Sequence, residues 1–237
     1  VKPIFYNLSI SVPKNKVNNF IPKFARGLFE DQLLYGLKLI GGDLTSSLQH
    51  INITITIFGE TLNKKSISRD GAKIGDILYV TGVLGLSKIG LDNFFSKSKR
   101  FVLAKKRYLF PEPRVDLGLR LNTIANCMID ISDGLSSEIM HLCKSSDLGC
   151  TIYEDKIPMD PQMIRLAEEF GINPITAVLN GGEDYELLFT ISLGDYDKIK
   201  HNPSLTAIGH MTDSKPIQLI TNAEQAIELE AQGWKAF

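Results

Sequence analysis

The chain has 237 residues, 43% hydrophobic and 22% charged, which is enough for one large domain or two smaller ones with a sizeable core. The formal net charge of −1 gives no reason to expect a nucleic acid or a membrane surface as a partner. The three cysteines include no Cys-x-x-Cys pair, which argues against a disulfide framework or a zinc site and favours a reducing cytoplasm. The sequence predicts neither a membrane span nor a signal peptide.

In chain order, the first predicted element is a helix over residues 17–36, where apolar side chains recur near helical spacing and Pro22 suits the first turn. Residues 51–58 alternate apolar and polar side chains almost without fault, which predicts a β-strand with one buried face. The polar, turn-rich stretch that follows predicts a boundary between domains 1–66 and 67–237.

Beyond this boundary, strands and helices interleave without a strict βαβ rhythm, which predicts an α+β fold. The expected elements are a strand at 76–82, helices near 87–95, 115–126 and 161–171, and a strand at 185–191. One group of basic residues is interpreted as a solvated loop and helix face rather than a polyanion site: Lys97, Lys99, Arg100, Lys105, Lys106 and Arg107.

Residues 128–137, Met-Ile-Asp-Ile-Ser-Asp-Gly-Leu-Ser-Ser, form the most informative stretch. Its two isoleucines alternate as in a half-buried strand, so Asp130 and Ser132 share the opposite face. The strand breaks at Asp133, and a helical stripe of apolar side chains follows: Leu135, Ile139, Leu142 and Cys143. A fold tolerates such gathered carboxylates most readily with a cation between them. The alternative is that Asp133 is only an N-cap and Asp130 only a solvated strand end.

Two further segments pair glycines with acids, each at an expected element boundary. Residues 41–43 are Gly-Gly-Asp after a short apolar run, and residues 181–184 are Gly-Gly-Glu-Asp before an alternating strand. Paired glycines let the backbone approach a ligand closely, and the acids beside them suit metal-bridged phosphates better than a bare anion. Gly-Gly-Asp is also ordinary turn chemistry, and Glu183 could be a solvated residue at the start of a strand.

Together, these motifs resemble those of the thiamine-monophosphate kinases, in the superfamily of aminoimidazole-ribonucleotide synthetase. The resemblance covers essentially the whole chain, and the ordered set is specific although no single motif is. The chain has neither a Walker loop nor protein-kinase motifs. The segments that carry the resemblance are, in order, 41–43 (GGD), 68–76 (SRDGAKIGD), 80–82 (VTG), 130–134 (DISDG) and 181–186 (GGEDYE).

The resemblance implies a two-domain α+β fold, with an N-terminal α/β domain whose strands form a barrel across a dimer and a larger C-terminal α+β domain. It also implies phosphorylation of thiamine monophosphate to thiamine diphosphate with ATP and several Mg²⁺ ions. Carried over by motif, the Mg²⁺ ligands are Asp43, Asp130 and Asp133. The residues of the ATP site are Gly42, Asp43, Arg69 and Ser132. Glu183 would contact the thiamine portion of the substrate, and Trp234 or Phe237 would pack against it.

This inventory suits a reaction between two polyanions, because divalent ions held by carboxylates screen the charges while bridging phosphate oxygens. The acceptor phosphate is largely ionised near pH 7, since its second pKa is about 6, so no general base is needed. We therefore expect direct in-line transfer, with Asp130, Asp133 and Arg69 as the catalytic residues. Glu183 suits the positive thiazolium of the substrate.

The chain departs from the family pattern in three places. Relatives carry further metal-binding acids upstream, and none of these is present before Val1, so roughly the first quarter of a typical member is expected to be missing. The chain as given is then expected to be weakly active or inactive, and the full-length protein a cytoplasmic homodimeric enzyme. Leu44 stands where threonine is common, and Phe110 where many relatives have arginine.

Two other functions compete with this interpretation. One is another ATP-using member of the same superfamily, such as an aminoimidazole-ribonucleotide or selenophosphate synthetase. The other is a non-catalytic metal- or nucleotide-binding scaffold. Only a thiamine-monophosphate kinase would release ADP in a reaction that requires thiamine monophosphate.

Overall fold

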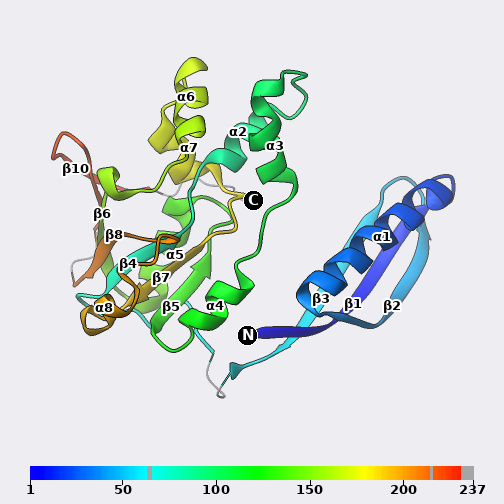
Figure 1. Ribbon diagram of the computed structural model, residues 1–237, viewed down its shortest axis with the longest axis horizontal. Coiled ribbons are helices and arrows are strands. Elements are labelled where there is room, and N and C mark those ends of the chain that lie inside the picture. Colours follow the sequence, from blue (N-terminus) through cyan, green and yellow to red (C-terminus); the bar gives the residue numbers. More distant parts are fainter. Residues whose placement is uncertain (63–65, 214–215, 231–237) are drawn as a thin grey trace. The chain divides into compact units, whose positions relative to one another are not determined.

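The computed structural model describes residues 1–62, 66–213 and 216–230. The chain divides into two compact units, Val1–Ser66 and Ile67–Phe237, and each is described by itself (Figure 1). Among the described residues, no helix has the length and apolar character needed to cross a membrane.

The N-terminal unit contains a three-stranded sheet in the order β2-β1-β3 and the helix α1 (Figure 1). β1 pairs in parallel with β2 and antiparallel with β3. The bounds of its elements are β1 (Lys2–Pro13), α1 (Val17–Tyr35), β2 (Lys38–Ser47) and β3 (Asn52–Glu60).

The helix expected over residues 17–36 is confirmed as α1, but Pro22 lies inside it rather than in its first turn. The ring of Pro22 removes one backbone donor, and the helix continues past it. α1 ends at Gly36, which takes the left-handed conformation (φ 66°) that glycine adopts most readily at a helix C-terminus.

The strand expected at residues 51–58 is confirmed as β3, but its predicted buried face is wrong. Ile53, Ile55 and Ile57 are 41%, 44% and 58% exposed. They pair with Ile10, Leu8 and Tyr6 of β1 across the sheet. The pocket under α1 is lined by residues of α1, β1 and β2, and by no residue of β3. The helix therefore covers only the part of the apolar face that β1 and β2 form, and the isoleucines of β3 stay exposed.

The C-terminal unit is a seven-stranded sheet in the order β10-β9-β6-β8-β4-β7-β5. Its pairs are antiparallel except the parallel pair β6–β9. The strands are β4 (Ile77–Thr81), β5 (Ala125–Asp130), β6 (Gly149–Tyr153), β7 (Leu187–Ile191), β8 (Leu205–Thr212), β9 (Ile217–Ile220) and β10 (Ala226–Glu228).

The described α-helices of this unit include three near the expected positions 87–95, 115–126 and 161–171, each shorter than expected. A fourth follows Asp133, as the apolar stripe predicts, and three others were not predicted individually. In chain order, the described helices are α2 (Leu86–Asp92), α3 (Val102–Leu109), α4 (Val115–Leu121), α5 (Leu135–Ser146), α6 (Pro161–Glu169), α7 (Pro174–Gly181) and α8 (Tyr196–Ile199). Among its described residues, this unit also has short 3₁₀ segments at Lys99–Phe101, Glu154–Lys156 and Leu193–Asp195.

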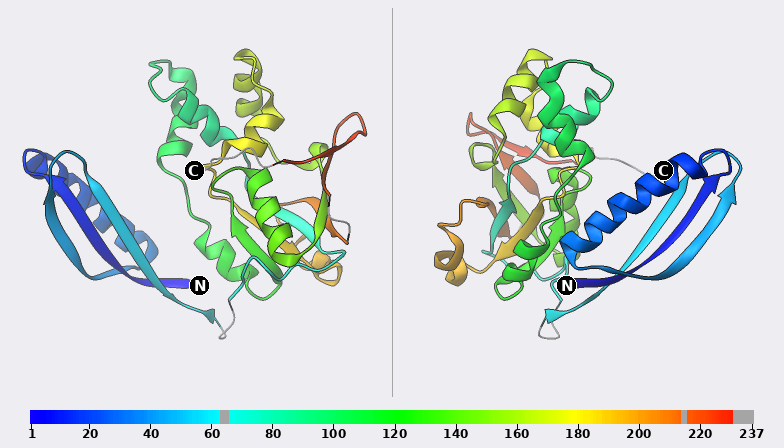
Figure 2. Two further views of the ribbon diagram at one scale, coloured as in Figure 1. Left: turned by 180° about the vertical axis from the view of Figure 1, so that it is seen from behind. Right: turned by 45° about the vertical axis from the view of Figure 1, so that its right-hand side comes forward.

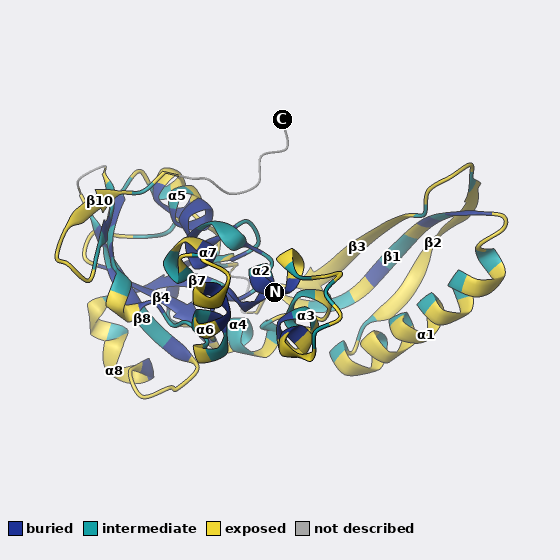
Figure 3. Ribbon diagram, turned by 90° about the horizontal axis from the view of Figure 1, so that it is seen from above, coloured by how far each residue is buried: buried dark blue, intermediate teal, exposed yellow. Residues whose placement is uncertain are grey.

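Apolar side chains pack on both faces of the C-terminal sheet. In β4, Leu78 and Val80 point into a large core shared with α2, α5, α6 and α7, because alternate residues of a strand face opposite sides. Tyr79 points into a smaller core on the other face, where its ring stacks on Phe189 with centroids 5.6 Å apart. Figure 3 shows the contrast with the N-terminal unit, whose sheet and helix are largely exposed.

Candidate active site

The segment between β5 and α5 carries the two predicted catalytic aspartates. β5 ends at Asp130, Ile131 is fully buried, and Asp130 is exposed, as the alternation predicts. Figure 2 shows α5, which follows, lying against the sheet. The predicted stripe of α5 is buried in the large core: Leu135, Ile139, Leu142 and Cys143.

The turn into α5 depends on Gly134, which has φ 112°. A Cβ at this position would lie 2.6 Å from the Leu179 carbonyl oxygen, so only glycine fits. Asp133 does not act as an N-cap, because no side chain caps α5. Instead, the Asp133 N–H donates to Glu138 Oε1 at 3.1 Å.

A second segment, the acid loop (residues 181–186), docks directly against this turn. The N–H groups of Glu183 and Tyr185 donate to the carbonyl oxygens of Ser132 and Ile131, each at 2.8 Å. The Ile131 N–H donates in return to the Glu186 carbonyl oxygen at 2.8 Å. Two motifs about 50 residues apart in the sequence are therefore joined by backbone hydrogen bonds.

Along the acid loop, half-buried and buried side chains alternate. Glu183 and Tyr185 are half-buried, whereas Asp184 and Glu186 are buried. The expected strand from Tyr185 begins only at Leu187, because the loop residues Glu183 and Tyr185 take left-handed backbone conformations, with φ 61° and 51°.

Glu186 anchors the acid loop through a buried ionic cluster. Its carboxylate accepts hydrogen bonds from Arg114 Nε and Nη2 at 2.8 and 2.6 Å and from the Thr81 hydroxyl at 2.5 Å, and it pairs with Arg107. The interpretation of Arg107 as part of a solvated basic face is therefore wrong. Helical spacing on α3 places it inward, which residue type alone does not reveal.

Asp184 is the second anchor of the acid loop. Its Oδ2 accepts the Gly85 N–H at 2.9 Å, at the turn before α2. Burial raises the pKa of Asp184 to about 6, although the Gly85 hydrogen bond and the charge of Arg107 act in the opposite direction.

Glu138, in the first turn of α5, has a buried carboxyl group that contacts Asp133. Burial raises its pKa to about 7, the hydrogen bond from Asp133 N–H lowers it, and the charges of Asp133 and Asp130 raise it further. Its Oε2 is buried without a hydrogen-bond partner among the described residues. Sequence reasoning missed Glu138, although its position on the buried stripe of α5 could have indicated it.

Arg69 and Asp130 line the same open pocket, which has a volume of about 650 Å³. This volume is within the range of small-molecule sites. The Met128 N–H donates to the Ser68 carbonyl oxygen at 2.9 Å, which holds the Arg69 segment along β5. The other residues of the pocket are Ile67, Ser68, Asp70, Met128, Ile129 and Ser145.

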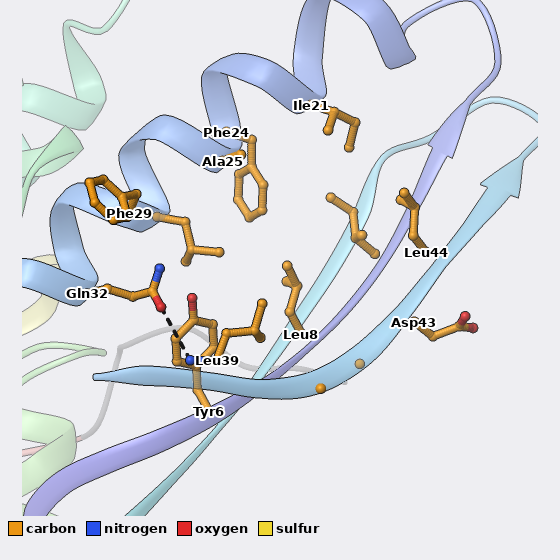
Figure 4. Close-up of a pocket in the computed structure, with 14 residues that line it drawn as sticks. Tyr6, Leu8, Ile21, Phe24, Ala25, Phe29, Gln32, Leu39, Asp43 and Leu44 are labelled. Atoms are coloured by element: carbon orange, nitrogen blue, oxygen red, sulfur yellow. Dashed lines mark hydrogen bonds between the residues drawn. The ribbon is translucent and has the colours of Figure 1, made fainter. Parts of the chain in front are cut away.

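Gly42 and Asp43 belong to the N-terminal unit, where they line the pocket between β2 and α1 (Figure 4). They lie inside β2, so the expectation of an element boundary here is wrong. The register with β1 shifts between Tyr6 and Asn7, just before the glycines. Gly42 has φ 151°, and a Cβ on it would lie 1.8 Å from the Leu8 carbonyl oxygen, so the motif serves close strand pairing rather than a turn.

Thus the C-terminal unit brings together Arg69, Asp130, Ser132, Asp133 and Glu183, while Gly42 and Asp43 lie in the other unit. Trp234 and Phe237 lie outside the described residues.

Within the described part of each unit, no three His, Cys, Asp or Glu side chains form a metal-binding group. The two aspartates nevertheless fit Mg²⁺, which commonly takes one or two carboxylates and completes its shell with water and substrate phosphates.

Comparison with known proteins identifies the family. No protein-family model matches the chain. The thiamine-monophosphate kinase of Buchnera aphidicola subsp. Schizaphis graminum is 37% identical over 238 residues, which cover 95% of this chain and 72% of that protein. The corresponding protein of Aquifex aeolicus is 32% identical over 236 residues, which cover 97% of this chain and 73% of that protein.

Solved structures agree with these relatives. The structure described as AaThiL complexed with AMPPCP and TMP superposes with a TM-score of 0.87 and 30% identity, covering 99% of this chain and 74% of that one. A HypE–HypF complex has a TM-score of 0.79 and 19% identity, and so shares the fold alone. The expected aminoimidazole-ribonucleotide synthetase-like α+β fold is therefore confirmed, and the chain belongs to the thiamine-monophosphate kinase family of enzymes.

Proposed function

We propose that the protein phosphorylates thiamine monophosphate to thiamine diphosphate by direct, Mg²⁺-assisted, in-line transfer from ATP. Family membership supports the reaction, and a relative that is 30% identical has been solved with AMPPCP and TMP. The observation that supports the proposal is the backbone pairing of the Asp130–Asp133 turn with the acid loop that contains Glu183.

In this proposal, different residues face the phosphates of ATP and the cationic thiazolium of thiamine monophosphate. Arg69 shares a pocket with Asp130, so its guanidinium is available to phosphate oxygens of ATP. Ser132 and Gly42 are the other residues that we propose for ATP binding. Glu183 would face the cationic thiazolium of thiamine monophosphate, and Trp234 or Phe237 would pack against that end. An already ionised acceptor phosphate needs no base, so alignment of the reacting atoms supplies most of the rate.

Asp43, Asp130 and Asp133 would hold Mg²⁺ in this proposal. When bound, Mg²⁺ supplies positive charge that offsets the repulsion between donor and acceptor phosphates. Without that charge, Asp130 and Asp133 would repel ATP.

The proposal includes a cytoplasmic homodimer that assembles through the N-terminal unit. Exposed isoleucines on β3 support an apolar interface there. Three buried free cysteines suit a reducing compartment. Analytical ultracentrifugation of the protein expressed from its complete gene tests the dimer, and a monomer at micromolar concentration would contradict it.

The decisive test of the reaction is ADP release by the protein expressed from its complete gene, with Mg²⁺-ATP and with or without thiamine monophosphate. Asp133→Asn should reduce the rate by about two orders of magnitude or more, because a lost metal ligand weakens transition-state charge stabilisation. Asp213→Asn, at an exposed aspartate after β8, is the matched control and should leave the rate unchanged. ATP binding without ADP release that depends on thiamine monophosphate would instead favour a scaffold.

A further inference from the structure

The acid loop holds an aromatic residue in a backbone conformation that such residues rarely adopt. Tyr185 has φ 51° and Glu183 has φ 61°, both in the left-handed region. This region is unfavourable for bulky side chains and is ordinarily taken by glycine or asparagine. Glycine takes a positive φ at Gly182 of the same loop. A tyrosine at position 185 therefore adds a side chain at a conformational cost.

The surroundings of the acid loop hold this strained conformation in place. The N–H groups of Glu183 and Tyr185 are bonded to the turn that follows β5, each at 2.8 Å. The side chains of Asp184 and Glu186 are buried and bonded on the opposite side. Backbone strain that neighbouring structure enforces in this way is typical of functional sites.

The consequence of the strain is that Glu183 and Tyr185 emerge on the same, half-buried side of the loop. The Tyr185 hydroxyl donates a long hydrogen bond of 3.4 Å to Glu183 Oε2. Burial raises the pKa of Tyr185, and the nearby charges of Glu183, Asp130 and Asp133 add to the increase. The hydroxyl therefore stays protonated at neutral pH and remains a donor.

We propose that Tyr185 is a positioning residue, whose hydroxyl orients the Glu183 carboxylate toward the cationic end of the substrate. This inference rests on the proposed function. A carboxylate on a loop has two oxygens and free side-chain torsions, so a donor fixed on one oxygen leaves the other aimed at the cation. Loss of the hydroxyl should weaken recognition of thiamine monophosphate and leave ATP recognition unchanged.

The test is steady-state kinetics of Tyr185→Phe in the protein expressed from its complete gene. We expect the KM for thiamine monophosphate to rise about fivefold to tenfold, as for loss of one hydrogen bond of ordinary strength, because the bond to Glu183 is long. kcat, the KM for ATP and the melting temperature should change little, because the ring and the loop backbone remain. Tyr153→Phe, at another half-buried tyrosine on β6, is the matched control and should have no effect.

A double-mutant cycle distinguishes positioning from packing. If Tyr185 acts through Glu183, then Tyr185→Phe should add nothing to the KM increase of Glu183→Gln. The inference would be overturned if Tyr185→Phe raised the KM by the same factor in the wild type and in Glu183→Gln, or if Tyr185→Phe alone left the KM unchanged. Either result leaves the proposed function standing, provided that the wild type turns over thiamine monophosphate. A wild type with no reaction that depends on thiamine monophosphate would overturn the proposed function and this inference together.

Titration calorimetry with thiamine monophosphate gives an independent measurement. Tyr185→Phe should weaken binding by the same factor as the KM, and Tyr185→Gly should weaken it at least as much without lowering the melting temperature, since glycine relieves the strain at φ 51°. Tight binding by Tyr185→Gly would contradict the assignment.

Discussion

In the C-terminal unit, helices pack on both faces of the sheet, whereas in the N-terminal unit α1 leaves much of the apolar sheet exposed. The two glycine–acid motifs reflect this difference. The acid loop is held by buried carboxylates and backbone bonds, while residues 41–43 lie in an exposed strand. A glycine–acid motif next to an apolar run can therefore be fixed by buried contacts, as in the acid loop, or lie in an exposed strand, as at residues 41–43, and the sequence pattern alone does not distinguish the two.

The largest effect on stability should come from the buried anchor of the acid loop. Glu186→Ala would leave Arg107 and Arg114 without their shared buried partner, and we expect a loss of about 3–5 kcal/mol in the free energy of unfolding. Glu112→Ala is the control, because Glu112 also pairs with Arg114 but is 72% exposed, and it should change stability by less than about 1 kcal/mol. Chemical denaturation followed by circular dichroism measures both, and similar losses would refute the difference in anchoring.

A matched pair of isoleucines compares the two units directly. Ile139→Ala, in the large core, should cost about 2–5 kcal/mol because it leaves a cavity. Ile55→Ala, 44% exposed on β3, should cost less than about 1 kcal/mol. Chemical denaturation of the monomeric protein measures the free energy of unfolding of both variants. A comparable loss at Ile55 would show that another surface covers β3 in solution.

A smaller effect should depend on pH through Glu138. Its pKa of about 7 in the folded protein is above the ordinary value of 4.5, so folding favours the protonated form. The associated stability is fully present below pH 4.5 and is lost as the pH rises through 7. Between pH 5.5 and 8, the wild type should lose about 1–2 kcal/mol relative to Glu138→Gln. Parallel stability–pH curves for the two proteins would contradict this assignment.

Local patterns in the sequence were sufficient for several conclusions. The period of α1, the alternation of β3 and the buried stripe of α5 each follow from side chains that are neighbours along the chain. The ordered motifs were sufficient for the family and the α+β fold, which the relatives confirm. The assigned roles of Asp43, Asp130 and Asp133 stay predictions.

Other features were decided only by contacts between distant segments. The sequence places Arg107 among solvated lysines, yet a partner 79 residues away holds it in a buried ion pair. Likewise, the exposed isoleucines of β3 alternate as a buried strand would, because periodicity records which side chains share a face and not what covers that face. The conformation of Tyr185 also depends on the turn after β5, since its backbone alone would avoid a positive φ. The sequence by itself thus determined several local elements and the family, whereas tertiary packing decided burial, ion pairing and the strained geometry of the site.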